Sequence, residues 1–402
     1  MKTAIVKTAK LTALVSSLAL VTAAYADDAA APAAAAAAPA APTAPPFPSY
    51  GGSLTANATP YNFVAGPVGT IYVGGVVSAI AEGQTNLPNP NAEKSQVDIS
   101  NAQIFINKTD GLIQFAAQAG GYSIPDLGTP YVKSSTITDA TYGTFSQGYI
   151  KLVPNGNFSL EVGKLPTLIG DEYTFSFENF NIQRGLLWGQ ESAVSRGVQA
   201  NYTAGPVALS AAWTDGFYSD KYNWATLSAA WTIDSADTLT FVGGGNTDRK
   251  TDVSTSVTNV YQNNSQIYNL IYTRTSGSWT ISPYLQYTDV PALAFEGTKS
   301  TSTTGAALLA SYKVNDNVSL PVRLEYITQS GSKGDNSAPL LYGSGSSAWS
   351  FTVTPTYQYK AFFVRGELSY VGLSSGTVGD EFGKNGDKTN QFAGMLETGI
   401  LF

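Results

Sequence analysis

The sequence predicts an all-β fold, a transmembrane, antiparallel, up-and-down β-barrel of about 16 strands, within a range of roughly 14 to 18. Three observations support this prediction. Hydrophobic and polar residues alternate with period two through most of the chain after residue 70. Short turns alternate with longer polar connections. The chain also begins with a secretory signal and ends on an aromatic residue.

Residues 1–26 have the features of a secretory signal peptide. Three lysines precede an apolar run over residues 11–21, and Ala24 and Ala26 form an A-x-A-like cleavage site. The apolar run is shorter than the roughly 20 residues that a membrane helix requires, and no later run approaches that length. We therefore expect cleavage after Ala26 and export without a helical anchor.

Residues 27–60 are expected to form a periplasmic linker, followed by the barrel at 61–402. The linker is rich in Ala and Pro and carries little charge. Proline at short intervals blocks the helix that alanine favours and biases the chain toward extended polyproline II geometry. The composition does not distinguish a simple tether from an arm that reaches peptidoglycan or another partner.

The composition excludes several classes of function. Residues 1–26 hold three of the 22 basic residues and no acid, so the mature chain has 19 basic against 29 acidic residues, a formal charge of −10. An acidic chain without a basic tract argues against nucleic-acid binding. The absence of Cys and His removes thiol chemistry, cysteine metal sites and the commonest general base. We expect no cofactor, no metal and no enzymatic activity, since an outer-membrane hydrolase would need catalytic residues that are not seen.

Residues 347–360 illustrate the alternation. Trp349, Phe351 and Tyr357 fall on one face of an extended chain, and Ser350 and Thr352 fall on the other. About sixteen segments alternate in this way and have the length of a tilted strand that crosses a bilayer. These segments are 70–81, 95–107, 111–120, 142–153, 157–164, 193–204, 207–216, 222–233, 238–246, 265–275, 278–288, 304–313, 318–329, 347–360, 361–371 and 389–402.

The connections between these segments alternate in length. Outer-membrane barrels have short turns on the periplasmic side and long loops outside. The longer connections are 121–141, 165–192, 247–264, 330–346 and 372–388. Aromatic residues on the apolar face near strand ends, as in lipid girdles, are Tyr202, Trp231, Trp279, Tyr359 and Phe402. The alternative fold, a soluble sandwich or β-helix, predicts fewer aromatic residues on the outside.

The connection 165–192 differs from the other loops because it combines many charged and aromatic side chains. Such a mixture indicates a loop that packs against the protein and presents charge to a wet space. We predict that it folds inward into the mouth of the barrel. The alternative is an ordinary surface loop with a few anchoring aromatic residues.

The alternation also predicts which charged side chains face the lumen. The predicted lumen wall comprises Lys151, Glu161, Arg323, Glu325, Arg365 and Glu367, with Glu397 also inside. Opposed charges across an opening orient water and disfavour apolar solutes. Alternatively, these side chains pair with their neighbours and only keep a polar interior satisfied.

Two stretches carry a resemblance to known families. The last strand, NQFAGMLETGILF, resembles the terminal strand of Gram-negative outer-membrane proteins, which implies a Gram-negative outer membrane and a role for Phe402 as the signal read by the barrel assembly machinery. The stretches GKLPTLIGDE, NIQRGLLW and SRGVQANYTAGPVALSAAWTDGF resemble the putative β-barrel porin-2 group. In general porins the third long loop folds inward, with acidic residues facing basic ones on the wall, and the subunits form trimers.

If the first strand starts in the periplasm, 165–192 connects strands 5 and 6 and is the third long loop, the one that the resemblance implies folds inward. The implied pore constriction comprises Asp171, Glu172, Glu178 and Arg184. The leading functional hypothesis is a porin that sits in outer-membrane lipid and passes small hydrophilic solutes and ions by passive diffusion. The alternative is a barrel plugged by this loop that acts as an adhesin or structural anchor through its outer loops. Ion conductance separates the two hypotheses.

Overall fold

The computed structural model describes residues 48, 50–57, 59–88, 92–248 and 260–402. All of them belong to one unit, residues 41–402. The expected signal peptide 1–26 and residues 27–47 of the expected linker lie outside the described residues. Within the described part of the chain, no helix is long and apolar enough to cross a membrane.

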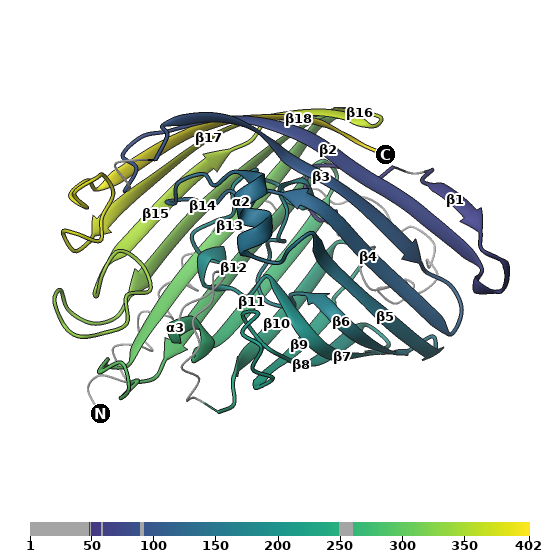
Figure 1. Cartoon of the computed structure of the whole chain (residues 1–402), viewed down its shortest axis with the longest axis horizontal. Coiled ribbons are helices and arrows are strands. Elements are labelled where there is room, and N and C mark those ends of the chain that lie inside the picture. The colour runs from purple at the N-terminus through teal and green to yellow at the C-terminus, as the bar shows by residue number, and fades with distance from the viewer. Residues whose placement is uncertain (1–47, 49, 58, 89–91, 249–259) are drawn as a thin grey trace, which may run out of the picture. The chain divides into compact units, whose positions relative to one another are not determined.

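Sixteen antiparallel strands form a closed barrel, so the expected all-β fold and strand count are confirmed (Figure 1). Each strand pairs with the next along the chain, and the last pairs with the first. The strands are β2 (Thr70–Gln84), β3 (Ser95–Lys108), β4 (Ile113–Tyr122), β5 (Phe145–Asn155), β6 (Phe158–Pro166), β7 (Val194–Ala204), β8 (Val207–Thr214), β9 (Trp224–Thr232), β10 (Asp237–Asn246), β11 (Gln266–Ser276), β12 (Trp279–Val290), β13 (Thr301–Asn315), β14 (Val318–Gln329), β15 (Ser347–Val353), β16 (Thr356–Tyr359), β17 (Phe362–Ser375) and β18 (Asn390–Leu401).

Two labels do not add strands to the barrel. Strands β15 and β16 continue one another between β14 and β17, and the break falls at Pro355. Proline has no amide N–H to donate to a ladder, which accounts for the interruption. Strand β1 (Tyr61–Val64) pairs with the first residues of β2. The short helices within the described residues are η2 (Gly66–Val68), α2 (Ser134–Ala140), η3 (Ser176–Glu178), η4 (Trp188–Gln190) and α3 (Val260–Asn263).

Burial follows the predicted alternation. In β15, Trp349 and Phe351 are exposed on the outer face, whereas Ser350 and Thr352 are buried. In β17, Phe362 and Leu368 are exposed and Arg365 is buried between them. The predicted girdle residues Tyr202, Trp231, Trp279, Tyr359 and Phe402 are all exposed. The outer face is therefore apolar and aromatic, as contact with lipid requires.

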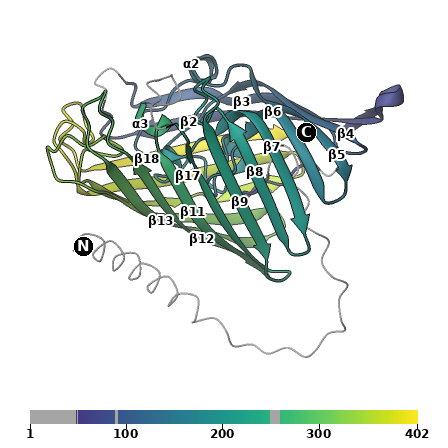
Figure 2. The same cartoon turned by 90° about the horizontal axis from the view of Figure 1, so that it is seen from below.

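The connections separate the two ends of the barrel. One end, the short-turn end, has turns of a few residues such as 205–206 and 277–278. The other, the long-loop end, has connections such as 123–144, 167–193 and 330–346. Strands β7 to β13 run side by side between these ends (Figure 2). In an outer-membrane barrel the short-turn end faces the periplasm.

The barrel closes where β18 meets β2. Beyond the ladder, the Gly75 N–H donates to the Phe402 carbonyl at 2.8 Å, and the Phe402 N–H donates to the Gly75 carbonyl at 2.9 Å. The Phe402 ring lies against Gly75, where an added Cβ would sit 2.5 Å from a ring carbon. The final aromatic residue thus occupies space that only glycine leaves free.

We predict that Gly75→Val weakens the closure of the barrel. Overpacking of this kind costs about 1–3 kcal/mol, to be measured as the free energy of unfolding by urea in detergent micelles. Gly83→Val is the matched control, since Gly83 is on the same strand and its nearest contact lies 3.7 Å from an added Cβ. Equal effects of the two substitutions would contradict the packing of Phe402 on Gly75 as a stabilising contact between β18 and β2.

Candidate functional site

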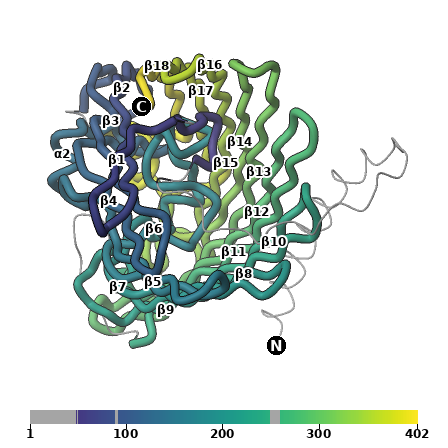
Figure 3. Tube along the Cα trace, turned by 90° about the vertical axis from the view of Figure 1, so that its right-hand side faces the viewer, coloured from purple at the N-terminus to yellow at the C-terminus, as the bar shows by residue number. Residues whose placement is uncertain are grey.

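Loop 167–193, between β6 and β7, contacts the inner side of several strands. The Ser176 hydroxyl donates to Glu397 of β18 at 2.9 Å, and the Leu187 N–H donates to Glu325 of β14 at 3.2 Å. The Tyr284 hydroxyl of β12 donates to Glu191 at 3.1 Å. Because these strands lie around the barrel from one another, the loop passes through its interior. Figure 3 looks at the barrel from the short-turn end.

Aromatic side chains give the loop an apolar anchor. Phe175 and Phe177 are fully buried, and their rings stack with centroids 6.0 Å apart. Phe177 also packs against Phe105 of β3 at 5.5 Å, and Phe175 against Tyr122 of β4 at 5.0 Å. These large rings remove a substantial apolar area from water. The loop is therefore packed against the β3–β4 part of the wall.

Arg323 of β14 ties the loop to the opposite part of the wall. Its guanidinium donates to Glu172 of the loop at 2.5 Å and to the Gln183 carbonyl at 2.7 Å. The neighbouring Glu325 carboxylate lies 3.2 Å from Arg323 Nε. The side chains of Arg323, Glu172 and Glu325 are at most 1% exposed. Buried charges of this kind are tolerated only when they are paired and hydrogen-bonded.

A second buried group joins the loop to β17 and β18. Arg365 pairs with Glu397 and donates to the Ser176 carbonyl at 3.0 Å. Glu397 also accepts from Ser100 of β3 at 2.8 Å. Glu367 of β17 accepts the backbone N–H groups of Ile182 and Gln183 at 2.5 and 2.9 Å. The wall carboxylates thus satisfy backbone donors that a loop removed from water would otherwise leave unpaired.

Arg184 lies at the centre of the loop and is fully buried. Its guanidinium donates to the Thr174 carbonyl at 3.0 Å and to the Ile182 carbonyl. Its backbone pairs with residues 125–127 of the loop before β5. Burial lowers the pKa of Arg184, and Glu172 and Asp126 oppose this shift. Burial also raises the pKa of Asp126 to about 7, against the effect of Arg184.

The remaining predicted site residues lie apart from this cluster. Asp171 accepts from Ser282 of β12 at 2.5 Å, and burial raises its pKa to about 7. Glu178 caps η3 by accepting the Phe175 N–H at 3.0 Å. Lys151 of β5 pairs with Glu161 of β6 at 3.0 Å. The structure therefore brings Glu172, Arg184, Arg323, Glu325, Arg365 and Glu367 to the interface of loop and wall.

Sequence reasoning missed several contributors. Asp126 comes from another loop, and Ser100 and Ser176 are small polar residues without any motif. Residues 50–57, expected in the linker, contact the inside of the wall: the Thr55 N–H donates to Gln358 of β16 at 2.8 Å. The two glycines at 51 and 52 were a signal that the chain passes close to other backbone.

Two cavities adjoin the loop. One, of about 780 Å³, lies at the short-turn end and is lined by residues 52, 53, 55–57 and 59, by turn residues 315–319 and by Phe180. The other, of about 440 Å³, lies at the long-loop end and is lined by residues 185, 186 and 188–191 and by residues of six other connections at that end. Its acidic lining residues are Asp126, Glu191, Asp380 and Glu381. Among the described residues, no group of three or more acidic side chains is placed to hold a metal ion.

Comparisons with known proteins identify relatives of this barrel. The family model described as "Putative beta-barrel porin-2, OmpL-like" matches residues 70–402. A comparison with curated protein sequences finds no match.

Three solved structures are similar in fold. The trimer form of OmpT, an outer membrane protein of Vibrio cholerae, is 14% identical with a TM-score of 0.54, covering 82% of this chain and 98% of that chain. An anion-selective porin from Comamonas acidovorans is 11% identical with a TM-score of 0.54, covering 83% and 99%. The outer membrane channel DcaP of Acinetobacter baumannii is 10% identical with a TM-score of 0.55, covering 83% and 97%.

We predict that Arg323→Met strongly destabilises the folded protein. Removing this guanidinium leaves Glu172 and Glu325 buried without a counter-charge, which typically costs about 3–5 kcal/mol. Arg274→Met is the control, because Arg274 is half exposed in its pair with Asp237 and should cost less than about 1 kcal/mol. Urea unfolding of both variants in micelles measures the difference. A similarly small effect at Arg323 would mean that the buried pairs do not hold the loop.

The raised pKa of Asp171 predicts a pH dependence of stability. The folded protein keeps this proton up to about pH 7, whereas the unfolded chain releases it near the ordinary aspartate pKa of 3.8. Stability from this group is therefore full below about pH 4 and is lost as the pH rises through about 7. Asp171→Asn should flatten the stability profile between about pH 4 and 7. Parallel profiles for the two proteins would contradict this assignment.

Proposed function

Because this chain belongs to the family described as putative beta-barrel porin-2, OmpL-like, we propose that it forms a channel for passive diffusion of small hydrophilic solutes and ions. The family and the fold indicate an outer-membrane β-barrel. We further propose that the host is a Gram-negative bacterium. Members of porin families are typically channels and not enzymes, and the mechanism proposed here needs no cofactor.

The observation that carries the proposal is the polar inner face opposite the loop. Sixteen strands leave room for an aqueous interior, whereas about eight would be filled by side chains. On β7 to β10 the inward positions hold small polar residues, namely Asn201, Ser210, Ser228 and Thr240. All four side chains are partly exposed to solvent. A wet strip of wall of this kind suits hydrated solutes.

We propose that loop 167–193 is the constriction. Its buried ion pair with Arg323 and its hydrogen bonds to wall carboxylates fix it against the wall. Near the long-loop end Ile169 also packs with Trp224 and Val242, so we place the free passage along the rest of the inner face of β5 to β10. Asp171, Glu172, Glu178 and Arg184 would act there in two ways. Asp171 is partly exposed and can face solutes, whereas Glu172, Glu178 and Arg184 are buried and would hold the loop. Lys151 and Glu161, on β5 and β6, would line the passage.

The excess of acidic residues suggests a mild preference for cations. The porin from Comamonas acidovorans is described as anion-selective, so this preference would distinguish the two proteins. A homotrimer is also proposed, supported by the trimer form of the Vibrio cholerae protein. Phe402 is proposed as the signal for the barrel assembly machinery, since it ends the last strand with its ring exposed.

A second candidate function is a plugged barrel that acts through its outer loops as an adhesin or structural anchor. A specific observation favours it: residues of the loop belong to four apolar clusters inside the barrel, and Glu172 of the loop forms a fully buried ion pair with Arg323 of the wall. The cavities at the two ends also have different lining residues. The two candidate functions differ in one respect: the channel needs an open path past loop 167–193, and the plugged barrel has none.

We predict that the refolded mature chain, residues 27–402, gives stable single-channel steps in a planar bilayer. A salt gradient at about pH 8, where Asp171 is ionised, should show a mild preference for cations, and Asp171→Asn should reduce it because a carboxylate is removed from the passage. Ser282→Ala is the control, since it removes the hydrogen-bond partner of Asp171 without changing charge. A correctly folded barrel that conducts no ions would overturn the channel and support the plugged barrel.

A further inference from the structure

Residues 50–57 lie inside the barrel, although they precede its first strand. Leu54 is 1% exposed. It belongs to an apolar cluster with four inward side chains of the wall, namely Val76, Phe105, Phe363 and Leu401. These side chains come from β2, β3, β17 and β18, the strands on both sides of the closure. The segment is therefore held against the seam of the barrel.

The same segment packs against loop 167–193. An added Cβ at Gly52 would lie 2.1 Å from the Asn179 carbonyl carbon, and one at Gly51 would lie 2.6 Å from the Tyr173 ring. The Tyr50 and Phe177 rings lie 6.1 Å apart. No residue larger than glycine fits at position 52 without moving backbone. The segment and the loop thus form one packed unit.

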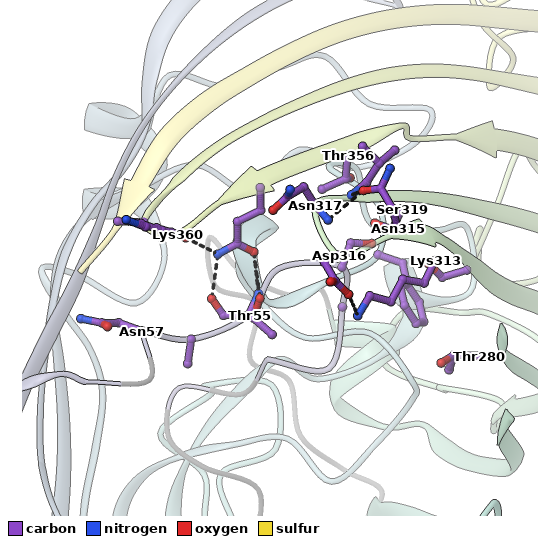
Figure 4. A pocket seen from close by; sticks show the side chains of 18 of the residues that line it. Thr55, Asn57, Thr280, Lys313, Asn315, Asp316, Asn317, Ser319, Thr356 and Lys360 are labelled. Carbon is purple, nitrogen blue, oxygen red and sulfur yellow. Dashed lines mark hydrogen bonds and ion pairs between the residues drawn. The ribbon is translucent and has the colours of Figure 1, made fainter. Parts of the chain in front are cut away.

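Hydrogen bonds fix the other end of the segment at the rim. The Thr55 N–H donates to Gln358 Oε1 at 2.8 Å, and Gln358 Nε2 donates to the Thr55 carbonyl at 2.9 Å. Gln358 lies on β16, two residues before the turn to β17. Figure 4 shows Thr55 and Asn57 in the cavity of the short-turn end, with Asp316, Asn317 and Lys360. The Gln358 side chain therefore pairs with both the N–H and the carbonyl of residue 55, as the backbone of a neighbouring strand would.

We propose that residues 50–57 are a built-in part of the channel that narrows its periplasmic opening and sets its size limit. The inference rests on the proposed channel function. Residues 52, 53, 55–57 and 59 line the cavity of about 780 Å³ at that end. Solutes that leave the constriction toward the short-turn end would pass this segment. Its backbone contributes to the passage, since its glycines and its Leu54 side chain face the loop and the wall.

Two deletions test the proposal. One variant lacks residues 27–57, and its matched control lacks only residues 27–47, so both lose the Ala/Pro-rich tract and keep every barrel strand. Single-channel conductance is measured in planar bilayers, together with the size of the neutral polyethylene glycols that enter the pore. We expect the control to match the full mature chain. The longer deletion should conduct about two-fold more and admit larger polymers.

A point variant gives the same test without a deletion. Gly52→Val should displace the segment from Asn179 and raise the conductance. The control Gly156→Val lies in the exposed turn between β5 and β6, where an added Cβ meets nothing within 4 Å, and should leave the conductance unchanged. Identical conductance and polymer limits for the full chain, the longer deletion and Gly52→Val would refute the size limit and leave the channel intact. If the full mature chain is closed and only the longer deletion conducts, residues 50–57 block the barrel instead of setting a size limit, and both the proposed channel and this inference are overturned. If no variant conducts, the proposed channel fails and this inference fails with it.

Discussion

A loop that passes through a barrel must satisfy its backbone and charged groups away from bulk water, and the structure depends on how loop 167–193 meets this requirement. The wall supplies both kinds of partner. Arg323 neutralises Glu172 of the loop, and the Glu367 and Glu325 carboxylates accept backbone N–H groups of residues 182, 183 and 187. Each of these pairs would be costly to break singly, because the remaining member would stay buried without a partner.

The barrel can supply these partners because its strands alternate. The same period that places aromatic residues on the lipid-facing surface places Arg323, Arg365 and their carboxylates on the inner face. Aromatic residues of the loop fill the space near β3 and β4, and the charged groups fasten it at β14, β17 and β18. One consequence is an uneven interior, with a packed side under the loop and a polar side on β7 to β10. Residues 50–57 extend the packed side to the short-turn end.

Most of the fold could be predicted from the sequence, since strand alternation and loop length are local properties. The segment 347–360 was predicted as one strand, and its interruption at Pro355 follows from the missing N–H. The alternation along each strand also predicted that the side chains of Arg323, Arg365 and Glu397 face the lumen, because alternation is a local property. Their pairing was not, because Glu172 and Arg323 are separated by 151 residues and only the closed barrel brings them together. The contact of residues 50–57 with Gln358 depends on closure in the same way.

The most direct test of this account is the coupling energy between Glu172 and Arg323. The variants Glu172→Gln and Arg323→Met and the double variant would be unfolded by urea in the same micelles, and their free energies combined in a double-mutant cycle. Contacting partners in a buried network couple by about 0.5–3 kcal/mol. The account predicts a value in the upper half of that range. A coupling near zero would mean that the loop is not held to the wall by this pair, and would contradict the account.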